Sequence, residues 1–108
     1  MIALVDPVTE EQIGQFTDCG PEVVDEAVAR AKASYEAGVW AGLPGRERAR
    51  IMWRIADLID ERAGEFAEID SANTGMMKLQ SKMVVPTCAE FFRYYAGWCS
   101  KINGTAYD

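Results

Sequence analysis

One segment, residues 45–70, constrains the fold most because apolar side chains recur in it at helical spacing. Basic residues crowd its beginning and acidic residues its end, an order that opposes the helix macrodipole. Each such charge costs only about 0.3–1 kcal/mol, whereas burying a large apolar side chain contributes roughly 1.5–3 kcal/mol. We therefore predict a long helix that packs through one broad face. That face carries Ile51, Ile55, Leu58, Ile59, Phe66 and Ile69.

The residues before this helix predict a hairpin and a further helix. Two apolar runs flank a turn signal at Asp6-Pro7, which predicts a β-hairpin over about 2–16. An isolated hairpin is marginal in water, so we expect it to pack against something else. Val24, Ala27, Val28, Ala31 and Tyr35 then recur at helical spacing over about 21–37. This helix should begin at Pro21, with Asp18 or Gly20 as its cap.

After residue 70 the pattern predicts a short helical piece, MMKLQSK, and a third long helix over about 84–101. Pro86 should open or kink this helix. Residues Thr105–Tyr107 should start a strand. Together, residues 1–108 predict a mainly α chain with a short amino-terminal β-hairpin.

Composition narrows the classes of function. Seventeen acidic residues against eleven basic ones give a net charge of −6, which argues against a nucleic-acid partner or an anionic membrane surface. The chain has no histidine, so histidine-based catalysis and histidine-ligated metals are excluded. Its start lacks a basic region typical of a signal peptide, and no apolar stretch approaches membrane-spanning length. We expect a cytoplasmic chain with reduced cysteines.

No motif in the sequence predicts catalysis. Glycine-rich dinucleotide and phosphate loops and the GxSxG elbow are missing. A carboxylate pair could form between Asp57 and either Asp60 or Glu61. It would lie in an acidic helix end, which is unfavourable for general acid–base catalysis. Cys88 and Cys99 should share one helix face as buried, inert thiols. Four arginines crowd the start of the 45–70 helix: Arg46, Arg48, Arg50 and Arg54. They form either a phosphate or partner site or, as we favour, a solvated face on which Glu47 pairs with Arg50 and Arg54 pairs with Asp57.

Four segments, in order, resemble those of aldehyde dehydrogenases. RYYAGW, at Arg93–Trp98, is similar to the family's RYYAGWADKxxG run. DPVTEEQIGQF resembles the hairpin NPATGEVIGxV, and IDSANTGMMKLQ resembles LESLDTGKPxxEA. The long stretch from PEVVDEAV to ADLIDER resembles the family's first two helices, so the resemblance covers essentially all 108 residues.

The resemblance implies the amino-terminal part of the α/β aldehyde dehydrogenase fold. Such enzymes oxidise aldehydes to carboxylic acids with NAD or NADP, using a cysteine thiolate and a glutamate-activated water. The family's PWNFP, ELGG and GQxC motifs have no counterpart here, and Cys19, Cys88 and Cys99 match no catalytic motif. We therefore expect no catalytic and no cofactor-binding residue in this chain. The family's segment packs helices around the cofactor-binding domain and leads into oligomerisation strands, which implies a homo-oligomer.

Some family members hold a monovalent cation with backbone carbonyls near the first strand and the acidic residue of the DTG motif. The matching positions here are Leu4 or Val5 and Asn73. Asn73 replaces the charged oxygen with a neutral amide, which weakens this expectation. Glu10 and Glu11 also replace the usual Gly-Glu, and Met76-Met77 replace Lys-Pro.

Two functional hypotheses follow. The first is a structural, non-catalytic portion of an aldehyde dehydrogenase, whose partner is the remainder of the dehydrogenase chain. The second is a stand-alone helical protein derived from that family, which self-associates or binds a partner through its apolar helix faces.

Overall fold

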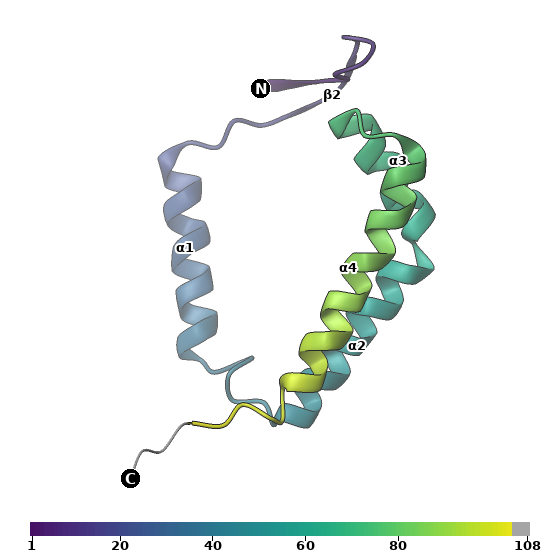
Figure 1. Ribbon diagram of the computed structural model, residues 1–108. Coiled ribbons are helices and arrows are strands. Elements are labelled where there is room, and N and C mark those ends of the chain that lie inside the picture. Colours follow the sequence, from purple (N-terminus) through teal and green to yellow (C-terminus); the bar gives the residue numbers. More distant parts are fainter. Residues whose placement is uncertain (105–108) are drawn as a thin grey trace.

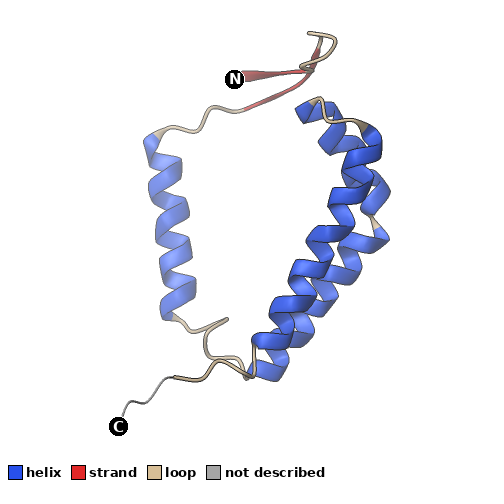
Figure 2. Ribbon diagram, in the orientation of Figure 1, coloured by secondary structure: helices blue, strands red, loops and turns tan. Residues whose placement is uncertain are grey.

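The computed structural model describes residues 1–104, in which two strands precede four helices (Figures 1 and 2). The predicted architecture, mainly α with an amino-terminal hairpin, is confirmed. The predicted strand start at Thr105–Tyr107 lies outside the described residues. The elements are β1 (Ile2–Val5), β2 (Gln12–Phe16), α1 (Pro21–Glu36), α2 (Gly45–Glu61), α3 (Ala63–Thr74) and α4 (Lys78–Trp98).

Strands β1 and β2 pair antiparallel, with Ile2 opposite Phe16 and an irregularity in register between Leu4 and Val5. Asp6 organises the turn between them. Its Oδ1 accepts hydrogen bonds from the backbone N–H groups of Val8, at 2.7 Å, and Thr9, at 3.2 Å. This is the local side-chain-to-backbone bonding that makes aspartate a turn residue.

The predicted single helix over 45–70 is wrong, because it is broken at Arg62 into α2 and α3. Arg62 has φ −113° and ψ 15°, outside helical values. Its guanidinium binds Glu65 at 2.7 and 2.8 Å and lies 5.2 Å from the centre of the Phe66 ring, both in the first turn of α3. On either side of the break, α2 and α3 both pack along α4.

Helix α4 is longer at its start than predicted, because the MMKLQSK segment joins it from Lys78 onward. Pro86 lies inside the helix and does not end it. Buried residues on both sides of the proline, Val85 before it and Ala89 after it, explain this. Ser81 and Val85 are buried, and Ser81 Oγ lies 2.8 Å from Asp70 Oδ2 of α3, so the first turns of α4 are fixed to α3.

Helix α1 begins at Pro21 with Gly20 as its cap, one of the two caps that the sequence predicts. It has no buried residue. Within residues 1–104 the extensive packing is between β1 and β2 and among α2, α3 and α4. Figure 1 accordingly shows α1 standing apart from α4, joined to the rest by the connectors at its two ends.

The core among these helices consists of small side chains. The buried residues are Ala56, Ala67, Ser81, Val85, Ala89 and Ala96. Such residues let helix backbones approach closely but bury little apolar area. The predicted broad face of 45–70 is only partly covered: Ile55, Ile59 and Phe66 are half-buried, whereas Ile51, Leu58 and Ile69 are exposed. That part of the prediction is wrong, because no described element lies over these three side chains.

The molecule is far more open than its length requires. Its radius of gyration is 18.9 Å, against about 13 Å for a compact domain of this size. Its accessible surface is 8597 Å², against roughly 6,000 Å² for a folded monomer of the same mass. The described helices include none with the length and apolar character needed to cross a membrane.

Candidate interaction surface

Helix α4 has two different faces. Its small residues pack on α2 and α3, and the opposite face is apolar and exposed. Tyr94 meets Tyr95 edge to face, with ring centres 5.2 Å apart, and its ring centre lies 6.4 Å from that of Trp98. We name this face the α4 stripe. It comprises Val84, Cys88, Phe91, Tyr94, Tyr95 and Trp98.

A groove of about 500 Å³ lies beside the stripe, between α3 and α4. Ile59, Phe66 and Ile69 line one wall, and Val84, Val85 and Cys88 line the other. Asp70, Asn73 and Thr74 supply the polar part of the lining. A groove with this lining suits apolar side chains of a partner, and it is continuous with the stripe through Val84 and Cys88.

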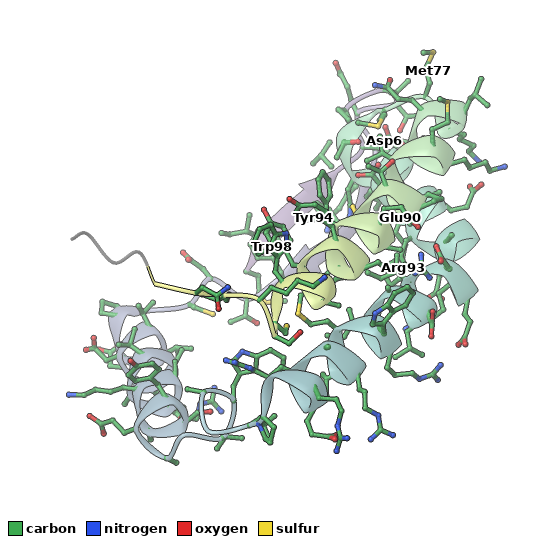
Figure 3. The ribbon with its side chains drawn as sticks, turned by 60° about the horizontal axis from the view of Figure 1, so that its bottom comes forward. Asp6, Met77, Glu90, Arg93, Tyr94 and Trp98 are labelled. Carbon is green, nitrogen blue, oxygen red and sulfur yellow. The ribbon has the colours of Figure 1, made fainter. Side chains whose placement is uncertain are left out.

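Arg93 holds the other side of α4 on α2. Its guanidinium lies 2.6 Å from Asp60, 3.1 Å from Asp57 and 2.8 Å from Glu90, and 5.5 Å from the centre of the Trp53 ring. Only 19% of its side chain is exposed. Hydrogen bonds to Asp60, then Asp57, then Glu90 raise the pKa of Arg93. Figure 3 shows Arg93 and Tyr94 on different sides of α4, so the Arg93 cluster orients the stripe away from α2.

The hairpin turn rests on the junction between α3 and α4. Gly75 ends α3 with φ 72°, in the left-handed region that favours glycine. A Cβ atom at Gly75 would lie 2.9 Å from Cγ of Pro7, so the turn approaches this backbone closely. Lys78 Nζ lies 2.6 Å from Glu68 Oε2 and lowers the pKa of that carboxyl, chiefly through the hydrogen bond. The junction thereby positions the strands relative to α4.

The residues predicted for a cation site lie in different elements. Leu4 and Val5 are in β1, and Asn73 is in the last turn of α3, where it lines the α3–α4 groove. Leu4 and Val5 line neither that groove nor the pocket of about 470 Å³ between the hairpin turn and the α3–α4 junction. Residues 1–104 contain no group of three or more cysteine or acidic side chains arranged to hold a metal. Monovalent-cation binding stays a prediction.

The thiols differ from expectation. Cys88 is exposed and Cys99 half-buried, so the prediction of two buried thiols is wrong for this chain. Cys99 Sγ lies 3.6 Å from Met52 Sδ and 3.5 Å from the Tyr95 carbonyl oxygen. Cys19, in the connector before α1, is exposed. Neither contact of Cys99 supplies a base.

Several charged residues of α2 form ion pairs, one of them different from the prediction. Glu47 pairs with Arg50 at 3.3 Å, as predicted. Arg54 pairs with Glu61, at 3.1 Å, and not with Asp57, because Asp57 faces Arg93. The role of Arg93 was not predicted from the sequence. The three-residue spacing of Glu90 and Arg93 was the available signal, but the pairing across to α2 depends on tertiary packing.

The described residues contain no glycine-rich loop of the kind that binds a dinucleotide in a Rossmann fold. In that fold, backbone N–H groups of a glycine-rich loop between a strand and a helix bind the pyrophosphate. The connector from β2 to α1 contains a single glycine, Gly20, followed by Pro21, which has no N–H to offer. Among residues 1–104 no other helix follows a strand directly.

Comparisons with known proteins are consistent with one another. The sequence model described as "Aldehyde dehydrogenase family" matches residues 1–108. Human mitochondrial 10-formyltetrahydrofolate dehydrogenase is 43% identical over 83 residues, which are 76% of this chain and 9% of that protein. The 5-carboxymethyl-2-hydroxymuconate semialdehyde dehydrogenase of Escherichia coli is 37% identical over 102 residues, 94% of this chain and 21% of that one.

Solved structures agree with these sequence relatives. An NAD-dependent aldehyde dehydrogenase from Sinorhizobium meliloti superposes with a TM-score of 0.91 at 33% identity. PnpE, solved in complex with nicotinamide adenine dinucleotide, superposes with a TM-score of 0.89 at 36% identity. Each comparison covers 96% of this chain and 21% of the other. The chain thus spans about a tenth to a fifth of the length of the relatives that it matches.

Proposed function

The chain belongs to the aldehyde dehydrogenase family, and from this premise we propose that it is the amino-terminal structural portion of such an enzyme. The whole enzyme would oxidise an aldehyde to a carboxylic acid. The names of its relatives support NAD as the cofactor of the parent enzyme, with NADP as the alternative. The observation that carries the proposal is the family match over all of residues 1–108.

This portion by itself would not catalyse the reaction. A nucleophilic thiolate needs a neighbouring base or cation that lowers its pKa. Cys99 faces a thioether and a carbonyl oxygen, and the chain has no histidine. The connector around Gly20 is not a glycine-rich loop of the kind that binds a pyrophosphate. We therefore assign the catalytic and cofactor-binding residues to the remainder of the dehydrogenase.

The role of the portion is to supply helices that cover the remainder of the enzyme. Its large side chains are exposed while its small ones are buried, which is the reverse of a self-contained domain. We further propose that the parent enzyme is a homo-oligomer and is cytoplasmic. The free cysteines among the described residues are compatible with a reducing compartment.

A stand-alone role as a self-associating helical protein is the less favoured alternative. The matched relatives carry the corresponding segment within much longer chains. Nothing in those relatives points to an independent protein of this length.

An activity comparison tests the proposal. We expect the 108-residue chain to give no reduction of NAD or NADP with a panel of aliphatic and aromatic aldehydes. We expect a chimera, in which this chain replaces the matched segment of the Sinorhizobium meliloti enzyme, to fold and reduce the cofactor. That enzyme without the segment is the control. Turnover by the isolated chain would overturn the proposal, and so would failure of the chimera to fold in this host and in PnpE.

A further inference from the structure

The segment that follows α4 contains an asparagine–glycine pair, Asn103-Gly104. Both residues are exposed and belong to neither a helix nor a strand. Within residues 1–104 the Gly104 N–H donates no backbone hydrogen bond. A Cβ atom at Gly104 would meet no atom of the described residues within 4 Å. The pair is therefore uncrowded and free to rotate at the point where the chain leaves α4.

We propose that Asn103 is a site of spontaneous deamidation, an inference that does not depend on the proposed function. The backbone nitrogen of Gly104 loses its proton and attacks the side-chain carbonyl carbon of Asn103. A new C–N bond forms between these atoms and closes a succinimide ring. The Cγ–Nδ2 bond of Asn103 breaks, and the amide nitrogen leaves as ammonia with the proton taken from Gly104. Water then opens the ring.

Ring opening has two products, and both change the chain where it leaves α4. Water that adds to the side-chain carbonyl gives aspartate. Water that adds to the main-chain carbonyl gives isoaspartate, in which the main chain runs through the side-chain carbon and is longer by a methylene group. Either product adds a negative charge to a chain whose net charge is already −6. The modification therefore alters the charge and, as isoaspartate, the backbone path between α4 and the residues that follow it.

Glycine is the residue that permits this reaction. It has no Cβ atom beside the attacking nitrogen, and its backbone has more conformational freedom than that of any other residue. The sequence Asn103-Gly104-Thr105 also fits the pattern for N-linked glycosylation. That modification needs a sugar donor and an enzyme of the secretory pathway, whereas deamidation needs only water. The exposed, uncrowded pair therefore favours deamidation.

Asn73, the only other asparagine in the sequence, is a matched internal control. It lies in the last turn of α3 and is followed by Thr74, which is still part of the helix. The helix fixes the main chain at Asn73 and engages the Thr74 N–H in a hydrogen bond, and the β-branched Thr74 side chain is stiff. Reaction at Asn73 therefore needs local opening of α3, whereas reaction at Asn103 needs none.

The test follows both asparagines in the 108-residue chain during incubation at mildly alkaline pH. Trypsin separates them, since Asn73 lies between Arg62 and Lys78, and Asn103 follows Lys101. Mass spectrometry measures the exchange of NH₂ for OH in each peptide, and chromatography separates isoaspartate from aspartate.

The incubation is repeated in guanidinium chloride, which unfolds the chain, and with the variant Gly104→Ala. Gly104 is not among the glycines with positive φ, and a Cβ atom there meets nothing within 4 Å. Alanine should therefore leave the fold unchanged, so that a slower reaction in this variant reports on the chemistry of the pair.

We expect Asn103 to deamidate severalfold faster than Asn73 in buffer, with isoaspartate among the products, and Gly104→Ala to slow Asn103 severalfold. The rate at Asn103 should rise with pH, because the deprotonated nitrogen is the attacking species. Unfolding should accelerate Asn73 and leave Asn103 nearly unchanged, because only Asn73 is held in a helix. Equal rates at the two asparagines in buffer would overturn the inference, and so would an Asn103 that reacts quickly only after unfolding.

Discussion

At the scale of single residues, Arg93 is the side chain that joins α4 to α2. It contacts Asp57 and Asp60 across the helix pair, Glu90 within its own helix and the face of Trp53. A planar guanidinium can bind two carboxylates and stack on an indole at the same time, which an ammonium cannot. The three carboxylates are partly exposed, so solvent weakens each pair.

We predict that Arg93→Gln lowers the urea midpoint of unfolding, since it leaves Asp57 and Asp60 repelling each other without a cation between them. Arg93→Lys should give an intermediate midpoint, because lysine keeps the positive charge but lacks the planar guanidinium that binds two carboxylates at once. Arg50→Gln is the matched control, as Arg50 has one partner, Glu47, and a side chain that is 74% exposed. Equal midpoints for the Arg93→Gln and Arg50→Gln variants would contradict the role given to Arg93.

At the scale of elements, α4 is organised by side-chain size. Ala89 and Ala96 are buried where the helix packs, and the aromatic residues lie on the exposed face. Small residues let two helix axes approach, and the close contact leaves no space for a larger side chain. The packing of α2, α3 and α4 therefore depends on keeping these positions small.

Replacement of Ala89 by leucine should destabilise the helix unit by about 1–3 kcal/mol, the typical effect of overpacking a tight interior. Gly97→Ala is the comparison within the same helix. A Cβ atom at Gly97 meets no atom within 4 Å, so alanine should stabilise the helix by up to about 1 kcal/mol. Urea unfolding of both variants measures the difference. An Ala89→Leu variant with an unchanged free energy of unfolding would show that the packing of α4 on the other helices is looser than described.

At the scale of the whole molecule, the chain is an open frame with its large apolar residues outside. The conformational cost of ordering a chain of this length is offset mainly by apolar burial. A core of alanines, one valine and one serine buries little apolar area. The chain is thus expected to gain much of its stability from packing against the remainder of the dehydrogenase.

Small-angle scattering of the isolated chain, extrapolated to zero concentration, should give a radius of gyration near 18.9 Å and well above the roughly 13 Å of a compact domain. The reason is that α1 is tethered at both ends and makes no extensive contact with the other helices. A value near that of a compact domain would mean that α1 closes over α4 in the free chain.

The sequence by itself determined the kinds of elements and the family. Apolar periodicity, Pro21 after Gly20, and the turn at Asp6 each act within a few residues of the chain, so local rules are enough to predict them. The ordered motifs around RYYAGW indicated the aldehyde dehydrogenase family. The absence of catalytic motifs in the sequence could likewise be read without a structure.

Only the tertiary structure decided where the helices break and what they cover. The continuation of α4 through Pro86 depends on packing between α3 and α4, which no local pattern encodes, and the break at Arg62 is accompanied by contacts of its side chain with Glu65 and Phe66 that helical spacing did not predict. The same is true of Asp57, which meets Arg93 and not its near neighbour Arg54. Apolar spacing predicts a face that can be buried, but burial depends on the elements that lie over it. For Ile51, Leu58 and the α4 stripe, residues 1–104 contain no such element.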